Sequence, residues 1–164
     1  MCIRDSCLPE QLVKDVINSA FFSAGQRCSA LRVLFIQDDV ADKVIHMLKG
    51  AMDELSIGNP QLYSTDLGPV IDEKALRVLQ NHKVRMEQVA KPIKSLTVPD
   101  IKGHYFAPQA VEIDNIKILE QEIFGPFLHV IRYKSNELNQ VIDCLLYTSP
   151  SPRDLSTSRM PSSA

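Results

Sequence analysis

The sequence has 164 residues, of which 45% are hydrophobic and 23% are charged, and its formal net charge is -2. These values are typical of a soluble globular domain, with no basic surface for nucleic acid and no apolar run of the roughly 20 residues that span a bilayer. Four cysteines without a secretion signal favour reduced thiols over disulfides, and no metal-ligand spacing is visible.

The two ends of the chain do not read as parts of a folded protein. MCIRDS, residues 1–6, can be encoded as ATG TGT ATA AGA GAC AG plus one base, and CLLYTS, which begins at Cys144, as TGT CTC TTA TAC ACA TCT. These DNA words are reverse complements over nearly their whole length and resemble the transposon end of sequencing-library adapters. A natural Pro- and Ser-rich linker would not explain this complementarity. We therefore predict that residues 1–6 and 144–164 are adapter-encoded, that 144–164 are disordered, and that residues 7–143 are the evolved segment.

The first part of this segment predicts a helix, a buried strand and a second helix. Pro9 with an acidic neighbour is typical of a helix start, and Gly25 is the predicted stop. The apolar residues between them recur at helical spacing and form one broad face. Residues 30–36 are short and apolar, as in a buried strand, and Asp38 opens a helix with its own apolar side.

The remainder predicts one more long helix between loops and strands. Residues 56–69 are rich in Gly and Pro and form a loop, and a helix follows over about residues 72–90. Residues 105–113 and 127–133 are strand candidates, and Ser135 starts a last helix. Helices that alternate with short apolar strands predict an α/β fold with a largely parallel sheet.

The stretch SAGQRCSALRVLFI contains a candidate nucleophile, Cys28. It lies between the first helix and the first strand, on the kind of connection that often carries active-site residues. Arg27 would favour a thiolate, whereas the carboxyl end of a helix that stops at Gly25 would disfavour one. A free cysteine is also among the residues most often buried in a core. From these residues alone, a nucleophile and a small core residue both stay open.

Three segments resemble motifs of the aldehyde dehydrogenase superfamily, in the family's order. FSAGQRCSALRVL resembles the catalytic-cysteine segment, QEIFGPFLHV the Glu-x-Phe-Gly-Pro cofactor motif, and GHYFAPQAVEI the Gly-x-Phe-x-Pro strand before it. GQRCSALRVL and STDLGPVID are most similar to the Δ1-pyrroline-5-carboxylate dehydrogenase branch, above all to bacterial bifunctional proline-utilisation enzymes. The resemblance covers essentially all of residues 7–143. It implies an α/β fragment of the aldehyde dehydrogenase catalytic domain, with an open, largely parallel sheet flanked by helices.

The resemblance implies NAD-dependent oxidation of L-glutamate γ-semialdehyde to L-glutamate in proline catabolism. Cys28 would attack the aldehyde to form a thiohemiacetal, hydride transfer to NAD would leave a thioester, and water would hydrolyse it. The Cys28 backbone N–H would donate to the developing oxyanion. Glu122 matches the family glutamate that binds the nicotinamide ribose, and Phe124 matches the aromatic residue near the nicotinamide ring. Arg27 and Ser29, beside the nucleophile, are candidates for holding the substrate carboxylate.

Each of these side chains also has a simpler interpretation. Without the motifs, Glu122 is a solvated charge at a strand edge and Phe124 an ordinary core residue. Arg27 is then a surface ion pair, and Ser29 a residue bonded to backbone. Four histidines show no metal-binding or cysteine-pairing pattern, and we expect them to be structural or exposed: His46, His82, His104 and His129.

Several parts that the family requires are missing from the sequence. By resemblance, the general-base glutamate, an oxyanion-hole amide and most of the NAD domain lie upstream of the cysteine, and the loop that anchors the substrate carboxylate lies downstream. We therefore expect this chain alone to show no dehydrogenase turnover. The full-length protein is expected to be a cytoplasmic homo-oligomer that binds a small aldehyde, and FAD is expected only if the protein has a separate proline dehydrogenase domain. Within this segment we see no signal for nucleic-acid binding and no membrane span.

Two alternatives stay open at this point. One is an aldehyde dehydrogenase of another specificity. The other is a non-catalytic α/β binding domain with Cys28 in its core, which predicts a thiol that resists alkylation.

Overall fold

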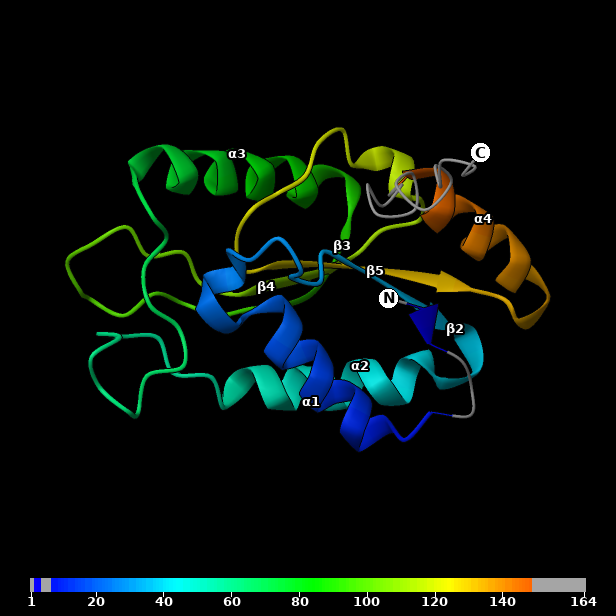
Figure 1. The fold of residues 1–164 in the computed structure, drawn as a ribbon, viewed down its shortest axis with the longest axis horizontal. Coiled ribbons are helices and arrows are strands. Elements are labelled where there is room, and N and C mark those ends of the chain that lie inside the picture. The colour runs from blue at the N-terminus through cyan, green and yellow to red at the C-terminus, as the bar shows by residue number, and fades with distance from the viewer. Residues whose placement is uncertain (1, 4–6, 149–164) are drawn as a thin grey trace, which may run out of the picture.

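The computed structural model describes residues 2–3 and 7–148, in which helices cover both faces of a five-stranded sheet (Figure 1). The strands are β1 (Cys2–Ile3), β2 (Val33–Gln37), β3 (Lys91–Ser95), β4 (Gln109–Glu112) and β5 (Phe127–Tyr133). The helices are α1 (Pro9–Ala20), α2 (Asp38–Asp53), α3 (Glu73–Val89) and α4 (Leu138–Thr148). Three short 3-10 helices lie at Phe22–Gly25, Ile116–Ile118 and Ser135–Glu137.

The sheet has the order β1-β2-β5-β4-β3 and is largely parallel, which confirms the predicted fold class. β1, β2, β5 and β4 pair in parallel, and β3 alone among the described strands runs antiparallel, on β4. The sequence did not predict β3, because KPIKS carries two lysines and Pro92 in five residues. Such a composition is typical of an edge strand, and the pairing shifts register between Pro92 and Lys94.

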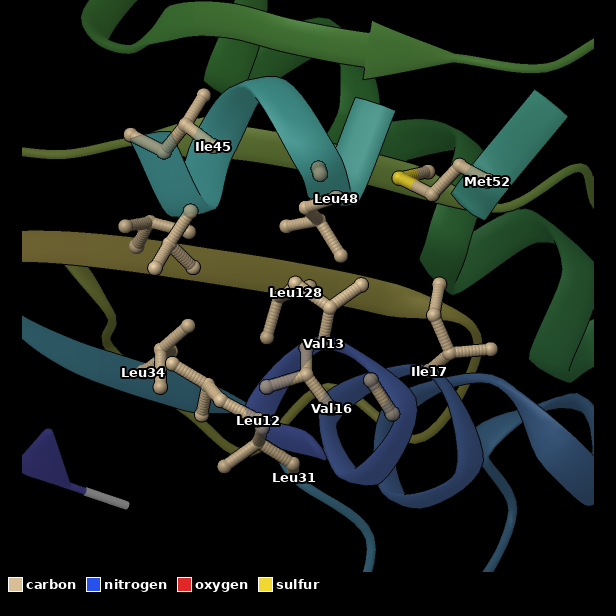
Figure 2. Close-up of a cluster of buried hydrophobic side chains, with 14 of the residues drawn as sticks. Leu12, Val13, Val16, Ile17, Leu31, Leu34, Ile45, Leu48, Met52 and Leu128 are labelled. Atoms are coloured by element: carbon tan, nitrogen blue, oxygen red, sulfur yellow. The ribbon is translucent and has the colours of Figure 1, made fainter. Parts of the chain in front are cut away.

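Alternating side chains on the central strands build one core on each face of the sheet. Leu34 of β2 and Leu128 of β5 point to the face covered by α1 and α2, as Figure 2 shows. Phe35 and Phe127, the neighbours of these residues in sequence, belong to the core beneath α3. Because successive strand residues face opposite sides, a continuous apolar run supplies both cores.

Local sequence explains where the later helices begin. The Asp72 carboxylate accepts from the Ala75 backbone N–H at 2.7 Å and caps α3, so this helix covers the predicted range to within one residue at each end. The last helix starts through the 3-10 turn at residues 135–137, where the Lys134 N–H donates to the Glu137 carboxylate at 2.9 Å. Residues 56–69 form the predicted loop.

The first helix ends at Ala20 rather than at Gly25. Ser23, Ala24 and Gly25 have φ values of 58°, 50° and 62°, all in the left-handed region. Three such residues in succession reverse the chain, and nothing in the sequence marks Ser23 and Ala24 for this conformation, which is uncommon outside glycine. The reversal carries the chain away from the helix axis toward Cys28.

Two predicted strands are shorter in the structure. The β2 ladder starts at Val33 rather than at residue 30, and β4 occupies only residues 109–112 of the predicted 105–113. Pro108, which has no N–H for a ladder, directly precedes β4. Its carbonyl still accepts from the Leu96 N–H at 3.1 Å, after β3.

Two described pieces of the chain lie in the ends predicted to be adapter-encoded. β1 pairs with β2, and α4 runs past residue 143 to Thr148. The other residues of those ends, 1, 4–6 and 149–164, lie outside the described residues. The origin of the DNA stays a prediction, because strand pairing and helix formation do not depend on how a peptide was encoded.

None of the helices in the part of the chain that the structure describes is long and apolar enough to cross a membrane.

Candidate active site

The end of α1 is capped by the segment that carries Cys28. Arg27 Nη2 donates to the Asn18 carbonyl at 2.6 Å, and the Leu31 N–H donates to the Ser19 carbonyl at 3.1 Å. The last carbonyls of a helix lack partners inside the helix, and a cation there is favourable. We expected the carboxyl end of α1 to disfavour a thiolate at Cys28. This effect is weakened, because α1 ends eight residues before Cys28 and these carbonyls already accept hydrogen bonds.

Cys28 is exposed and lines a cavity of about 690 Å³. The alternative in which this cysteine is a small residue in the core is therefore wrong. The same cavity is lined by Arg32, Glu122 and Leu145 and by five residues between the last strands: Ile116, Lys117, Leu119, Glu120 and Gln121. The thiol is thus accessible to a small molecule in a cavity that also contains a cation and a carboxylate.

Arg32 is a residue of this cavity that the sequence interpretation missed. Its guanidinium donates to the Gly25 carbonyl at 2.5 Å and to the Arg27 carbonyl at 3.1 Å, and its Nε lies 3.6 Å from Glu122 Oε1. Burial lowers the pKa of Arg32 from its usual value, and the Glu122 carboxylate opposes this effect. One signal was available: an arginine in a run predicted to be a buried strand needs partners.

Glu122 and Phe124 lie on one side of their segment, and Ile123 between them is buried. The Glu122 side chain is 57% exposed, so its carboxylate stays open to a ligand despite the ion pair with Arg32. Phe124 is 43% exposed, and the Arg32 guanidinium carbon lies 4.6 Å from its ring centroid. Phe124 is therefore not an ordinary core residue. Its ring and the Glu122 carboxylate both contact the same guanidinium.

Arg27 and Ser29 do not line the cavity that holds Cys28. They border a smaller hollow of about 210 Å³ beside α1, with Asp15, Asn18 and Ser19. The Asp15 carboxylate in this hollow would repel the carboxylate of a substrate. Arg27 acts instead as a cap for α1, and the substrate role predicted for both residues gains no support from where they lie.

The two motif segments touch backbone to backbone at their glycines. A Cβ added to Gly25 would collide with the carbonyl oxygen of Gly125 and come within 2.8 Å of the Ala20 carbonyl oxygen. This approach places the Cys28 segment directly against the segment of Glu122 and Phe124. Only glycine leaves room for it.

Gln26 fixes the other side of the Cys28 segment. Its side-chain oxygen accepts from the Ile71 N–H at 2.8 Å, and its nitrogen lies 3.5 Å from the Pro69 carbonyl. The conformation of the turn around Cys28 is thus held from the loop before α3 as well as from α1.

Two of the four histidines form a buried pair that the sequence did not reveal. His82 Nε2 lies 2.8 Å from His129 Nε2, and His129 Nδ1 donates to the Arg32 carbonyl at 3.0 Å. That donor fixes the tautomer in which His129 Nε2 accepts from His82. Burial lowers the pKa of both histidines to about 4, so both are neutral near pH 7. His46 and His104 are exposed.

The cavity and the cofactor-motif residues beside it offer a thiol, a carboxylate and an aromatic ring. Across residues 2–3 and 7–148, no three of the His, Cys, Asp and Glu side chains gather as metal ligands would. Glu122 offers acceptors for hydroxyl groups, and Phe124 offers an apolar ring beside them.

Comparison with known proteins agrees with the motif order. The sequence profile described as "Aldehyde dehydrogenase family" matches residues 1–144. The Bifunctional protein PutA of Escherichia coli is 43% identical over 150 residues, which is 87% of this chain but 11% of that protein. The crystal structure of a mutant of Bradyrhizobium japonicum Proline Utilization A (PutA) superposes with a TM-score of 0.87 at 44% identity, over 91% of this chain and 15% of that one.

More distant relatives have other names. The Malonate-semialdehyde dehydrogenase of Listeria monocytogenes is 36% identical over 77% of this chain and 27% of its own length. The 1-pyrroline-5-carboxylate dehydrogenase of Anoxybacillus flavithermus is 31% identical over 76% of this chain and 25% of its own length. The chain thus spans only a small part of each relative.

Proposed function

The chain belongs to the aldehyde dehydrogenase family, and we propose from this that it carries the nucleophile and part of the cofactor site of an NAD-dependent dehydrogenase. The proposed reaction is the oxidation of L-glutamate γ-semialdehyde, the open form of Δ1-pyrroline-5-carboxylate, to L-glutamate. One observation carries the proposal: Cys28 is exposed in a cavity that it shares with Glu122. Two residues 94 positions apart that match the family's nucleophile and ribose ligand line the same space.

Cys28 performs the covalent steps in this proposal. Its thiolate sulfur bonds to the aldehyde carbon, and the carbonyl electron pair moves to the oxygen, toward which the Cys28 N–H donates. After a hydride has left that carbon, a thioester to Cys28 remains. Water then breaks the carbon–sulfur bond, which releases the carboxylic acid and restores the thiol. The base that activates this water is not assigned to any residue of the chain.

The residues beside the cavity fit NAD, which when bound would accept the hydride. The half-exposed Glu122 carboxylate has acceptor capacity beyond its 3.6 Å ion pair and suits the two hydroxyl groups of a ribose. Phe124 presents a partly exposed ring next to this carboxylate, with Arg32 against it. An apolar ring is suited to contact a flat nicotinamide ring.

The choice of substrate rests on relatives rather than on a contact in this chain. The relatives with the highest identities given above are PutA proteins, and one further relative is named 1-pyrroline-5-carboxylate dehydrogenase. The similarity to a malonate-semialdehyde dehydrogenase supports the alternative, an aldehyde dehydrogenase of another specificity. Both substrates are aldehydes with a carboxylate, so the covalent chemistry at Cys28 would be the same.

Competition between substrate and an alkylating reagent tests the nucleophile in this chain. Iodoacetamide labelling of Cys28 is followed by peptide mapping, with and without L-glutamate γ-semialdehyde. We expect the semialdehyde to slow labelling, because a thiohemiacetal occupies the sulfur. Malonate semialdehyde in a parallel series compares the two specificities.

Cys7 serves as the reference within each sample, because it is partly buried against the core of α1. Equal protection of Cys7 and Cys28 would show ordinary thiol chemistry and contradict a site at Cys28. Labelling of Cys28 that is as fast in the folded chain as in urea, and unaffected by either aldehyde, would also contradict it. We expect no NADH formation by this chain alone. If the chain did form NADH, and if the Cys28→Ser variant did not, that expectation would be overturned.

A further inference from the structure

We propose that Arg32 is a positioning residue that holds the Cys28 segment and the Glu122–Phe124 segment in one fixed arrangement. We call residues 25–29 the nucleophile loop and residues 122–124 the cofactor segment. The inference rests on the proposed function for its catalytic meaning, but its structural content can be tested without turnover.

The Arg32 side chain contacts both segments at once. On one side, two guanidinium nitrogens donate to the Gly25 and Arg27 carbonyls of the nucleophile loop. On the other side, Nε faces the Glu122 carboxylate, and the guanidinium carbon lies 4.6 Å from the centre of the Phe124 ring. A planar guanidinium can bond in its plane and stack on a ring at the same time.

These contacts are directional and partly buried, which favours positioning over a general attraction of charges. The Arg32 side chain is only 13% exposed, whereas Glu122 is 57% exposed. Arg32 Nε is buried and makes no hydrogen bond of ordinary length with the described residues. A shift of Glu122 toward Arg32 would satisfy this donor, so the pair can tighten when a ligand orders the carboxylate.

The backbone of Arg32 is itself held by the adjacent strand β5. Its carbonyl accepts from both the backbone N–H and the Nδ1–H of His129, each at 3.0 Å. His129 in turn accepts from His82 of α3. The backbone from which the guanidinium extends is thus fixed by buried, neutral groups.

Lysine could not make the same set of contacts. One ammonium group can face a carboxylate, but it lacks the planar fork that spans two carbonyls and covers a ring. Arg27 gives a contrast within the loop, because its guanidinium turns away to the Asn18 carbonyl. The two arginines therefore have different tasks, and only Arg32 joins the two segments.

A single tryptophan can report this contact, because the chain contains none. In a Phe124→Trp background of the full 164-residue chain, acrylamide quenching measures how well the indole is covered. Arg32→Met should raise the quenching constant by up to about twofold, because the ring at this position is already 43% exposed and loss of the cation–π contact would uncover the rest. Arg32→Lys should restore part of the protection.

Arg132→Met is the matched control. Arg132 also makes two charged contacts, with Glu112 at 3.1 Å and Asp42 at 2.8 Å, but it lies away from both segments. The Arg132→Met substitution should leave the quenching of the indole in the Phe124→Trp background unchanged. Equal quenching in the Arg32→Met and Arg132→Met variants would overturn the proposal.

Amide hydrogen exchange in the chain with native Phe124 provides a second readout. Arg32→Met should speed exchange about tenfold or more in the nucleophile loop and the cofactor segment together, through loss of charged hydrogen bonds. Faster exchange in only one segment would show that Arg32 does not join them. Loss of the native circular dichroism in both Arg32 variants, but not in Arg132→Met, would assign Arg32 to the whole fold and also overturn the proposal. Aldehyde protection of Cys28 fails or succeeds independently of these outcomes.

Discussion

Replacing Gly25 with alanine tests whether the nucleophile loop depends on its close approach to Gly125. A positive φ costs a non-glycine residue about 1–2 kcal/mol. Ser23 and Ala24 already accept such values, so this cost alone does not require glycine at residue 25. The added Cβ would also meet the Gly125 backbone and lie 2.8 Å from the Ala20 carbonyl oxygen. Backbone atoms cannot rotate away, and overpacking of this kind costs about 1–3 kcal/mol.

We therefore expect Gly25→Ala to lower the free energy of unfolding by about 2–5 kcal/mol. Gly50→Ala is the matched control, because Gly50 lies within α2 and nothing would lie within 4 Å of its added Cβ. That change should stabilise the chain by about 0.5–1 kcal/mol. The two substitutions are chemically identical and are predicted to have opposite signs.

Urea denaturation followed by circular dichroism measures both variants, and alkylation of Cys28 before the main transition reports the loop. If Gly25→Ala changed the unfolding free energy by the same amount as Gly50→Ala, within about 0.5 kcal/mol, the backbone contact would not constrain the loop. Faster alkylation of Cys28 without any loss of global stability would place the whole effect in the loop. It would refute the magnitude worked out above.

Two further predictions concern the histidine pair and the core. Burial lowers the pKa of His129 and His82 to about 4, so the unfolded chain binds more protons between about pH 6.5 and 4, and the unfolding free energy falls as the pH falls through this range. His129→Gln should flatten this slope in urea titrations, and an equal flattening by His46→Gln at an exposed site would contradict the assignment. Leu128→Ala should lower the unfolding free energy by about 2–5 kcal/mol, because Leu128 is 0% exposed between α1 and α2. Leu62→Ala, at a 57% exposed position, should change it little, and similar losses in both variants would show that the core does not close as described.

Much of the architecture could be predicted from local patterns. Helical spacing, the Asp72 cap and the Gly- and Pro-rich loop identify α2, α3 and the segment between them, because these signals act within a few residues. β5 matches its prediction at both ends, since an apolar run of this length bounded by turn signals is typical of a buried strand. The failures lie where long-range contacts override local preference: the early end of α1, the short β4 and the edge strand β3.

The candidate site divides in the same way. Motif order by itself predicted Cys28, Glu122 and Phe124 as site residues, because residue types and spacing are properties of the chain. It did not show that Cys28 and Glu122 line one cavity, or that Arg27 turns away from it while Arg32 joins both segments. Nor did it show that His82 and His129, 47 residues apart, meet in the core.

The physical reason for this division is the range of the forces involved. Helix caps, periodicity and turn residues act over a few positions, so the sequence alone determines the α/β class and the residues available for chemistry. Which buried polar groups become partners depends on the sheet order, which sets β5 beside β2 and thereby brings His129 to the Arg32 carbonyl. Only the tertiary structure decided that Arg32, an unremarked residue in an apolar run, holds the two halves of the site together.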